Sequence, residues 1–260
     1  MFITLNNVRL YYEDLGQGLP LVFIHGLGEK SQSWHHQVNY FQKEYRVINL
    51  DLRAHGKSAN DASQIITISL FTQDVLALLE YLHIKKAVII GHSMGGLICQ
   101  ELAAYYPDRV IAMALSDTAG FYPPPFCTEG LKERLAFLET ATMEAMAELV
   151  AEKCCSPYVT PEVRQEIKEL FLSNEIEPYR QATVATFKSD YRAYHSKMNV
   201  PTVLIVGKYD KVTPLAYAEY LQSALPSARI AVISKAAHMT KVENPKEYNA
   251  VLDEFLKEIN

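Results

Sequence analysis

The sequence predicts an α/β fold built on a mostly parallel sheet with helices on both faces and a helical cap insertion. Three observations lead to this prediction. Short apolar stretches rich in β-branched residues alternate with stretches of helical periodicity. A Gly-His-Ser-Met-Gly sequence joins one such apolar stretch directly to a helical one. The alternation stops only between residues 121 and 198, where we find no convincing buried strand. Outside 121–198, parallel strands joined by helical crossovers explain the alternation of strand and helix patterns.

The first half of the chain supplies most of the predicted strands. Residues 2–5 and 8–13 alternate in polarity around Asn6-Asn7, which predicts a hairpin. The continuous apolar run at 19–24 is typical of a strand buried on both faces. We expect further strands at 45–50, 88–90 and 110–115, and helices at 34–41, 70–82 and 97–105.

The middle and last parts differ in character. Between 121 and 198 we expect helices at about 129–154, 161–172 and 176–188, separated by prolines and rich in aromatic residues. After it, strands at 203–206 and 229–233 flank a helix at 214–224, and a closing helix starts at Asn244-Pro245. We therefore assign 1–120 and 199–260 to one core and 121–198 to a helical cap over the strand ends.

Composition excludes several classes of protein. The 260 residues carry a net charge of −5 without a Lys/Arg block, which disfavours a nucleic-acid partner. No apolar run approaches the roughly 20 residues that span a bilayer. The first residues lack the basic start and long apolar core of a signal peptide. The four cysteines have no metal-ligand spacing and suit a reducing compartment. We expect a cytoplasmic protein without metal or cofactor, as a monomer or small homo-oligomer.

The sequence Gly91-His92-Ser93-Met94-Gly95 has the form of a nucleophile elbow. It follows an apolar strand and precedes a helical pattern, which is the context that this sharp turn requires. Gly91 and Gly95 supply the small residues that a tight turn needs on either side of the serine. We expect the Ser93 hydroxyl to stand clear of the backbone as the nucleophile, next to the N–H of Met94.

A serine hydroxyl needs a base within hydrogen-bond reach, and histidine has the suitable pKa. His238 lies in a loop directly after the last predicted strand, so its imidazole can reach the strand ends. His92 is excluded because its side chain leaves the elbow in another direction, and His25 is better placed to brace a loop. Solvated surface is the expected position of His35, His36, His83 and His195.

The base in turn needs an acid that fixes its tautomer. Asp210 immediately follows the strand at 203–206, at the same edge of the sheet. Asp117, after the strand at 110–115, is the competing acid and could reach the same edge. We favour Asp210, which gives the order Ser93, Asp210, His238 along the chain.

The negative charge that develops on a substrate oxygen needs preorganised N–H donors. His25-Gly26-Leu27-Gly28 follows a buried strand, and its glycines let the backbone turn the N–H of Leu27 towards the substrate. We expect Leu27 and Met94 to form an oxyanion hole. In a neighbouring loop, we expect hydrogen bonds rather than catalysis from Asp51, Arg53, His55 and Ser58.

Over nearly its whole length the chain resembles the α/β-hydrolase fold superfamily. The segments that carry this resemblance are HGLG, DLRAHGKS, GHSMGG, GKYDKVTP and AAHMTKVENP. They look like the branch of carboxylesterases, 3-oxoadipate enol-lactonases and cofactor-free haloperoxidases. The resemblance implies an eight-stranded sheet, a triad of Ser93, Asp210 and His238, and oxyanion positions at Leu27 and Met94. Dehalogenases and epoxide hydrolases of this superfamily carry aspartate in place of Ser93, which disfavours both chemistries.

These observations predict a serine hydrolase of the carboxylesterase type. Its substrates would be small esters, lactones or thioesters with an apolar acyl or aryl group under the aromatic-rich cap. Basic side chains that could hold a carboxylate, or simply face solvent, are Lys188, Arg192 and Lys197. Two other activities of the same triad remain open, namely C–C bond hydrolysis of ring-fission diketones and perhydrolysis of the haloperoxidase type. A ligand-binding receptor that keeps the fold without turnover is the alternative from another class.

Overall fold

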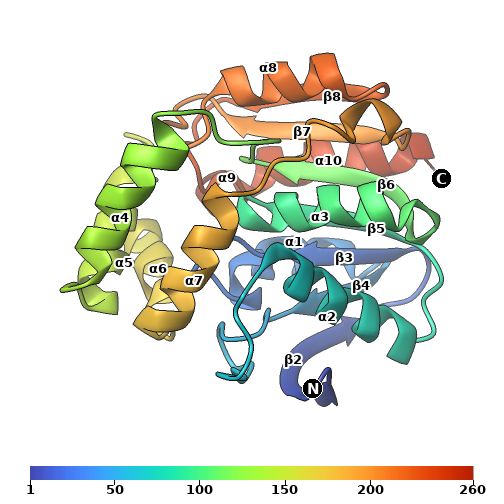
Figure 1. Cartoon of the computed structure of the whole chain (residues 1–260). Coiled ribbons are helices and arrows are strands. Elements are labelled where there is room, and N and C mark those ends of the chain that lie inside the picture. The colour runs from blue at the N-terminus through green and yellow to red at the C-terminus, as the bar shows by residue number, and fades with distance from the viewer. Residues whose placement is uncertain (260) are drawn as a thin grey trace.

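The computed structural model describes residues 1–259, whose strands form one eight-stranded sheet (Figure 1). The strand order is β1-β2-β4-β3-β5-β6-β7-β8. β1 and β2 are antiparallel to their neighbours, and the pairs from β4 to β8 are parallel. The strands are β1 (Phe2–Leu5), β2 (Val8–Leu15), β3 (Pro20–Ile24), β4 (Arg46–Leu50), β5 (Ala87–His92), β6 (Val110–Ser116), β7 (Thr202–Gly207) and β8 (Ala228–Ile233). The predicted fold class is confirmed.

Both faces of the sheet are covered by helices because successive strand side chains point to opposite faces. Val22 and Ile24 lie in the core formed with α2, α3 and α8, whereas Leu21 and Phe23 lie in the core formed with α1 and α10. The core helices are α1 (His35–Phe41), α2 (Ile68–Tyr81), α3 (Met94–Tyr105), α8 (Leu215–Ala224), α9 (Thr240–Glu243) and α10 (Pro245–Ile259). This two-sided burial explains why the strands read as continuous apolar runs.

The predicted N-terminal hairpin is present. Leu5 pairs with Val8, and the two asparagines between them adopt positive φ angles of 48° and 61°. Two consecutive residues with positive φ are the requirement of a tight hairpin turn, which asparagine tolerates well. β2 extends to Leu15, beyond the predicted end, because it also pairs with β4.

Residues 121–198 are mainly helical, and the helices predicted at 161–172 and 176–188 are confirmed within one residue. The expected helix at 129–154 is wrong, because the chain breaks at 139–142. The hydroxyl of Thr142 accepts a hydrogen bond from the N–H of Ala145 and starts a new helix there. The helices of this segment are α4 (Leu131–Leu138), α5 (Met143–Lys153), α6 (Pro161–Phe171) and α7 (Ile176–Phe187).

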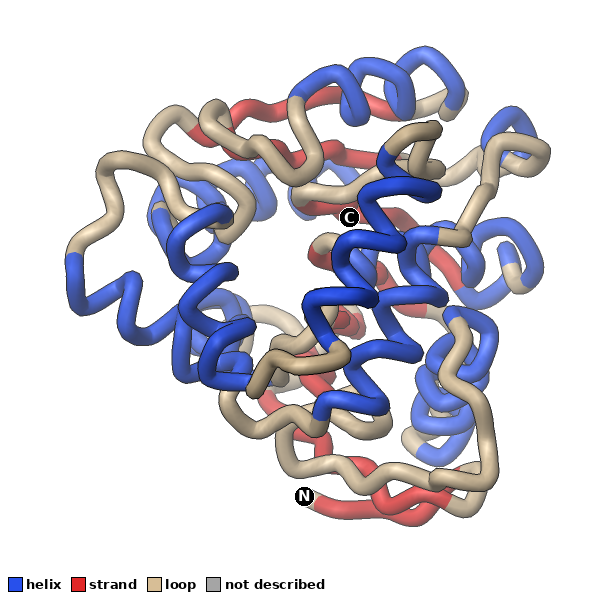
Figure 2. The backbone as a smooth tube through the Cα atoms, turned by 60° about the vertical axis from the view of Figure 1, so that its left-hand side comes forward, coloured by secondary structure: helices blue, strands red, loops and turns tan. Residues whose placement is uncertain are grey.

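The helices α4 to α7 lie beside one end of the strands, outside the two layers that cover the sheet (Figure 1). Figure 2, in which this side comes forward, shows them in front of the strands. They share an apolar cluster of their own, which includes Met146, Ile167 and Phe171. Met239 and Val242 of the core also belong to this cluster, so the helices pack on the segment that follows His238.

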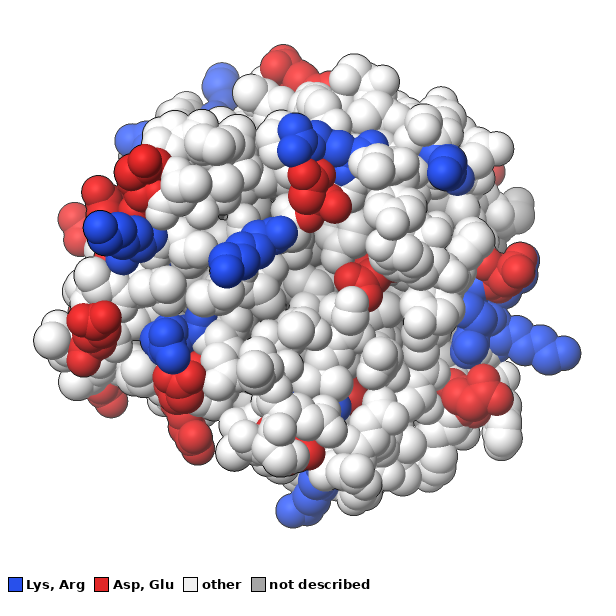
Figure 3. Space-filling model, in the orientation of Figure 1, with Lys and Arg blue, Asp and Glu red and all other residues white. Residues whose placement is uncertain are grey.

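Charged side chains are distributed without a large patch of one sign on the face seen in Figure 3. Basic and acidic groups lie there singly or in small mixed groups on an otherwise uncharged surface. Within residues 1–259, no helix has the length and apolar character that a bilayer crossing requires.

Candidate active site

Ser93 sits in a strained turn between β5 and α3. Its backbone has φ 51° and ψ −115°, a combination that is rare for a residue with a side chain. A Cβ atom at Gly91 would overlap the carbonyl oxygen of Gly95, and one at Gly95 would overlap that of Ile24. Only glycine fits at both positions, so the sequence builds the sharp turn that the motif predicts.

The structure brings together the three side chains that we predict as a triad. The Nε2 atom of His238 lies 3.1 Å from the Ser93 hydroxyl oxygen, and its Nδ1 atom lies 2.8 Å from an oxygen of Asp210. The Asp210 carboxylate also accepts hydrogen bonds from the N–H groups of Val212 and Thr213 and from the Thr213 hydroxyl. Asp210 is therefore held in place while one of its oxygens faces the imidazole.

The electrostatics of this pair favour a charged histidine. Burial alone would raise the pKa of Asp210, but His238 and the hydrogen bonds from His238 and Thr213 outweigh it and lower the pKa to about 2. Burial alone would lower the pKa of His238, but Asp210 raises it above its ordinary value of 6.5. Asp210 thus stays ionised at neutral pH and stabilises the imidazolium that forms when His238 takes a proton.

Asp117, the competing acid, is buried nearby with different partners. It accepts hydrogen bonds from the N–H of Gly207 (2.9 Å) and the hydroxyl of Thr240 (2.5 Å). Burial and repulsion from Asp210 raise the pKa of Asp117 well above its usual range. Among residues 1–259, no hydrogen bond joins Asp117 to His238, so its contacts are those of a group that ties loops together.

The N–H groups of Leu27 and Met94, which we predict as the oxyanion hole, have no hydrogen-bond partner in the part of the chain that the structure describes. Met94 is the first residue of α3, where such N–H groups have no partner in the helix. The loop is fixed on both sides, since His25 Nε2 accepts the N–H of Leu52 and the Asn174 amide donates to the carbonyl of Gly28. His25 therefore braces the loop, as the sequence suggests.

Sequence reasoning missed a buried charged group behind this site. Glu29 lies with one oxygen 2.6 Å from His92 Nδ1 and the other 2.8 Å from the Lys241 ammonium. All three side chains are at most 2% exposed. One signal in the sequence could have indicated this pair. Glu29 directly follows HGLG and Lys241 lies three residues after His238, so two opposite charges flank predicted site segments.

The neighbouring loop is tied by hydrogen bonds, as expected. Asp51 accepts the N–H groups of Ser31 (2.6 Å) and Lys57 (2.7 Å), and the Ser58 hydroxyl donates to the Asp51 carbonyl. Arg53 instead forms a buried two-point ion pair with Asp74 of α2. These contacts fix the loop against Ser31 and α2 without reaching the triad.

One histidine was placed wrongly from the sequence. His195 is 1% exposed rather than solvated, and its Nε2 atom lies 3.0 Å from the side-chain oxygen of Gln100. It belongs to a short 3-10 turn, His195–Lys197, which packs on α3. Polar neighbours in the sequence concealed this tertiary contact.

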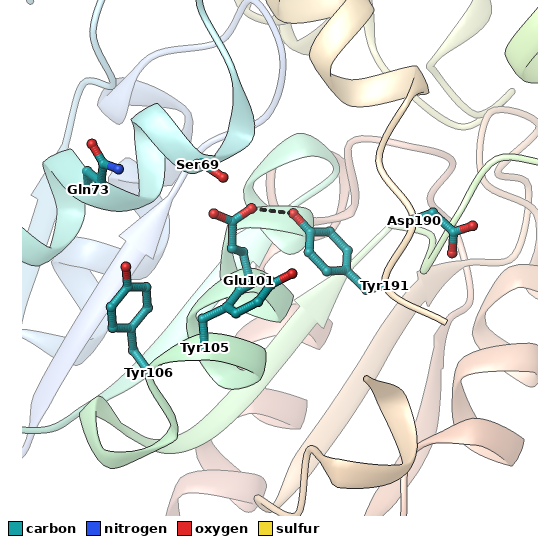
Figure 4. Close-up of a pocket in the computed structure, with 7 residues that line it drawn as sticks. All are labelled: Ser69, Gln73, Glu101, Tyr105, Tyr106, Asp190 and Tyr191. Carbon is teal, nitrogen blue, oxygen red and sulfur yellow. Dashed lines mark hydrogen bonds between the residues drawn. The ribbon is translucent and has the colours of Figure 1, made fainter. Parts of the chain in front are cut away.

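A cavity of about 590 Å³ lies beside α3 and contains none of the predicted site residues. In Figure 4 the carboxylate of Glu101 and the phenol of Tyr191 point toward one another. The Tyr191 hydroxyl donates to Glu101 over 2.7 Å, and both side chains are buried. This hydrogen bond connects the end of the 121–198 segment to the helix that follows Ser93.

We expect Tyr191→Phe to lower the free energy of unfolding by about 1–3 kcal/mol, because a buried carboxylate loses its donor. Urea denaturation would measure this loss. Since Glu101 and Tyr191 do not contact the triad, kcat for any substrate should stay within about twofold of the parent value. A larger fall in kcat with unchanged stability would contradict this structural role.

A larger cavity, of about 910 Å³, lies between the helical segment and the loop around Val212, and none of the five predicted site residues lines it. Two of its lining residues hydrogen-bond to predicted site residues: Val212 donates its N–H to Asp210, and the Cys154 carbonyl accepts the N–H of His238. Its apolar lining comes mainly from the helical segment and includes Phe126, Phe137, Leu149, Val150 and Val212. Lys188, Arg192 and Lys197 do not line it, and Arg192 pairs with Asp190.

Potential metal ligands gather elsewhere. Within residues 1–259, one group of three side chains has its ligand atoms within 4.8 Å of one another, namely His35, His36 and Glu166. No hydrogen bond or ion pair of the described residues joins them to Ser93, Asp210 or His238.

Comparisons with known proteins agree with the fold. A family model described as alpha/beta hydrolase fold matches residues 20–164. The chain is 28% identical to 3-oxoadipate enol-lactonase 2 of Acinetobacter baylyi over 263 residues, which cover 99% of this chain and 97% of that protein. A thermophilic esterase from Thermogutta terrifontis superposes with a TM-score of 0.92 at 26% identity, covering 100% of this chain and 98% of the esterase. An enol-lactonase from Burkholderia xenovorans superposes with a TM-score of 0.92 at 29% identity, covering 99% of this chain and 100% of the lactonase.

These matches confirm the resemblance drawn from the motifs. The family model covers more than half of the chain, and the relatives are matched along nearly their whole length. The chain belongs to the alpha/beta hydrolase fold family.

Proposed function

We propose that this protein is a serine hydrolase that cleaves small carboxylic esters, lactones or thioesters through an acyl-enzyme on Ser93. The observation that carries the proposal is the continuous contact from Asp210 through His238 to the Ser93 hydroxyl, over 2.8 and 3.1 Å. The similarity to an esterase and to enol-lactonases supports acyl transfer to water as the reaction.

In the first half of the reaction, His238 Nε2 takes the Ser93 proton as the serine oxygen attacks the acyl carbon. The carbonyl π electrons move onto the oxygen, which accepts hydrogen bonds from the N–H groups of Leu27 and Met94. When the C–O bond to the leaving group breaks, the imidazolium returns the proton to the departing alkoxide. In a lactone the alcohol stays attached to the acyl group.

The second half repeats these steps with water. His238 takes a proton from a water molecule, whose oxygen attacks the acyl carbon of the ester on Ser93. The collapse of the second tetrahedral intermediate breaks the bond to the serine oxygen, which regains its proton from His238. Each donor to the oxyanion contributes roughly 3–4 kcal/mol to catalysis in comparable enzymes.

We further propose that residues 121–198 act as a cap over the core formed by 1–120 and 199–260. An apolar acyl or aryl group would bind under this segment, whose aromatic and aliphatic side chains Phe126, Phe137 and Leu149 line the neighbouring cavity together with charged ones. Ring-fission diketones would need the same triad, so substrate tests must include them.

The decisive experiment treats the purified protein with a fluorophosphonate probe. We expect labelling of the parent protein, none in Ser93→Ala, and hydrolysis of p-nitrophenyl esters of graded chain length. A panel of lactones, thioesters and ring-fission diketones then ranks the substrates. Absence of both labelling and turnover would favour the ligand-binding alternative, and turnover of diketones alone would favour C–C bond hydrolysis.

The pH dependence of kcat/KM should report the titration of His238. The base acts in its neutral form, so activity is lost as the pH falls through its pKa. Because Asp210 raises that pKa, we expect the acid limb of the profile above pH 6.5. An acid limb well below pH 6 would contradict this assignment of the base.

A further inference from the structure

Three separate segments of the chain meet below the candidate active site. The first is the turn at 26–29, which carries Leu27 and closes with a hydrogen bond from the N–H of Glu29 to the carbonyl of Gly26. The second is the elbow, with His92 directly before Ser93. The third runs from His238 into α9, where Lys241 lies. A buried side chain from each segment takes part in one network.

His92 is the centre of this network. Its Nδ1 atom lies 2.6 Å from Glu29, and its Nε2 atom lies 2.6 Å from the main-chain carbonyl oxygen of His238. The Lys241 ammonium binds the other oxygen of Glu29 and lies over the ring of Trp34, 4.9 Å from the ring centroid. The main chain of Gly26 rests against the contact between Glu29 and His92, because a Cβ atom there would overlap both side chains.

The protonation of His92 follows from its two partners. A carbonyl oxygen only accepts hydrogen bonds, so Nε2 must carry a hydrogen atom. A bare nitrogen lone pair and a carboxylate oxygen would repel each other at 2.6 Å, so the contact with Glu29 must also contain a proton. His92 and Glu29 together therefore carry no net charge. His92 hydrogen-bonds to the His238 carbonyl and makes a close ionic contact with Glu29, which links the elbow to both neighbouring segments.

His238 is held by contacts on both its main chain and its side chain. Its N–H donates to the Cys154 carbonyl, its carbonyl accepts from His92, and its two ring nitrogens face Asp210 and Ser93. Without His92, the carbonyl of His238 would lose its partner, and the loop could shift. A displacement of about 1 Å between reacting groups can cost on the order of a hundredfold in rate.

We propose that His92 and Glu29, with Lys241 bound to the other oxygen of Glu29, are positioning residues that set the distance between His238, Ser93 and the oxyanion loop. This inference rests on the proposed function. A buried ion pair adds little to stability and is costly to desolvate, so structural specificity is a better explanation of its presence here.

The test compares His92→Phe with His195→Phe in the full-length protein. Both histidines are buried and bonded through Nε2, but His195 hydrogen-bonds to Gln100 on α3 and packs on the ring of Tyr220, and neither of these residues bonds to the triad. We expect His92→Phe to lower kcat by about a hundredfold with KM within about threefold. His195→Phe should lower Tm and leave kcat within about threefold of the parent. His92→Gln keeps an N–H donor for the His238 carbonyl and should regain at least about tenfold in kcat.

A second pair of variants decides the matter even if His92→Phe does not fold. Both are double variants that carry Lys241→Met, and they differ at residue 29, with Glu29→Gln in one and Glu29→Met in the other. Both remove the buried charges of Glu29 and Lys241, but only the glutamine side chain can donate a hydrogen bond to His92 Nδ1. We expect kcat to be about tenfold or more higher in the glutamine variant at equal Tm. Equal kcat in the two, or equal kcat in His92→Phe and His195→Phe, would overturn the positioning role. If the parent protein itself shows no hydrolysis that depends on Ser93, the proposed function is overturned instead.

Discussion

Ser93→Ala should lower kcat for the preferred ester by on the order of 10⁴- to 10⁶-fold, and His238→Ala should lower it to a similar extent. Without the hydroxyl there is no nucleophile to form the acyl-enzyme. Without the imidazole, the hydroxyl at 3.1 Å from Nε2 has no base to accept its proton. The residual rate would come from the oxyanion donors and from substrate binding alone.

Steady-state hydrolysis with each single variant and with the double variant measures this prediction. Because the two residues act as a unit, the double variant should be no slower than either single one. Ser58→Ala is the matched control, since its hydroxyl binds the Asp51 carbonyl in a neighbouring loop. Additive losses in the double variant, or a loss in Ser58→Ala as large as in Ser93→Ala, would contradict a shared proton transfer.

Local sequence patterns were sufficient for the elbow and the strands around it. The demand for glycine at 91 and 95 arises within one turn, and the apolar run before Ser93 is long enough to indicate a buried strand. Polar residues that directly follow the other strands are then expected near Ser93, because parallel strands end at the same edge of the sheet. The sequence therefore predicted where Ser93 and His238 lie, although they are 145 residues apart.

Contacts between distant segments could not be predicted in the same way. Glu29 and Lys241 are ordinary charged residues in two loops, and only the packed structure shows that they pair in the interior. The predicted exposure of His195 was wrong for the same reason, because its partner Gln100 lies on a helix 95 residues away along the chain. The break at 139–142 depends on one threonine cap within a good helical pattern, and such a local signal is weak.

The choice of acid was also open, since both Asp117 and Asp210 follow strands that end at the same edge. β6 and β7 are parallel neighbours with Ser116 paired to Ile205, which brings both carboxylates near His238. The side chains then diverge: Asp210 lies 2.8 Å from His238 Nδ1, while Asp117 binds Gly207 and Thr240. Their pKa values diverge too, and only that of Asp210 is lowered, to about 2.

We therefore expect Asp210→Asn to lower kcat by on the order of 10⁴-fold, because the amide neither stabilises the imidazolium nor holds the productive tautomer. Asp117→Asn should cost less than about tenfold, since the raised pKa of Asp117 favours a neutral carboxyl that an amide can replace. The loss of Asp210 should also shift the acid limb of kcat/KM in the residual activity to lower pH, because the attraction that raises the pKa of His238 is gone. Matched pH profiles of the two variants measure both effects, and the reverse ranking would assign the acid to Asp117. Such a result would require a rearranged loop at 207–213, since the hydroxyl of Thr213 and two N–H groups now hold Asp210 against the base.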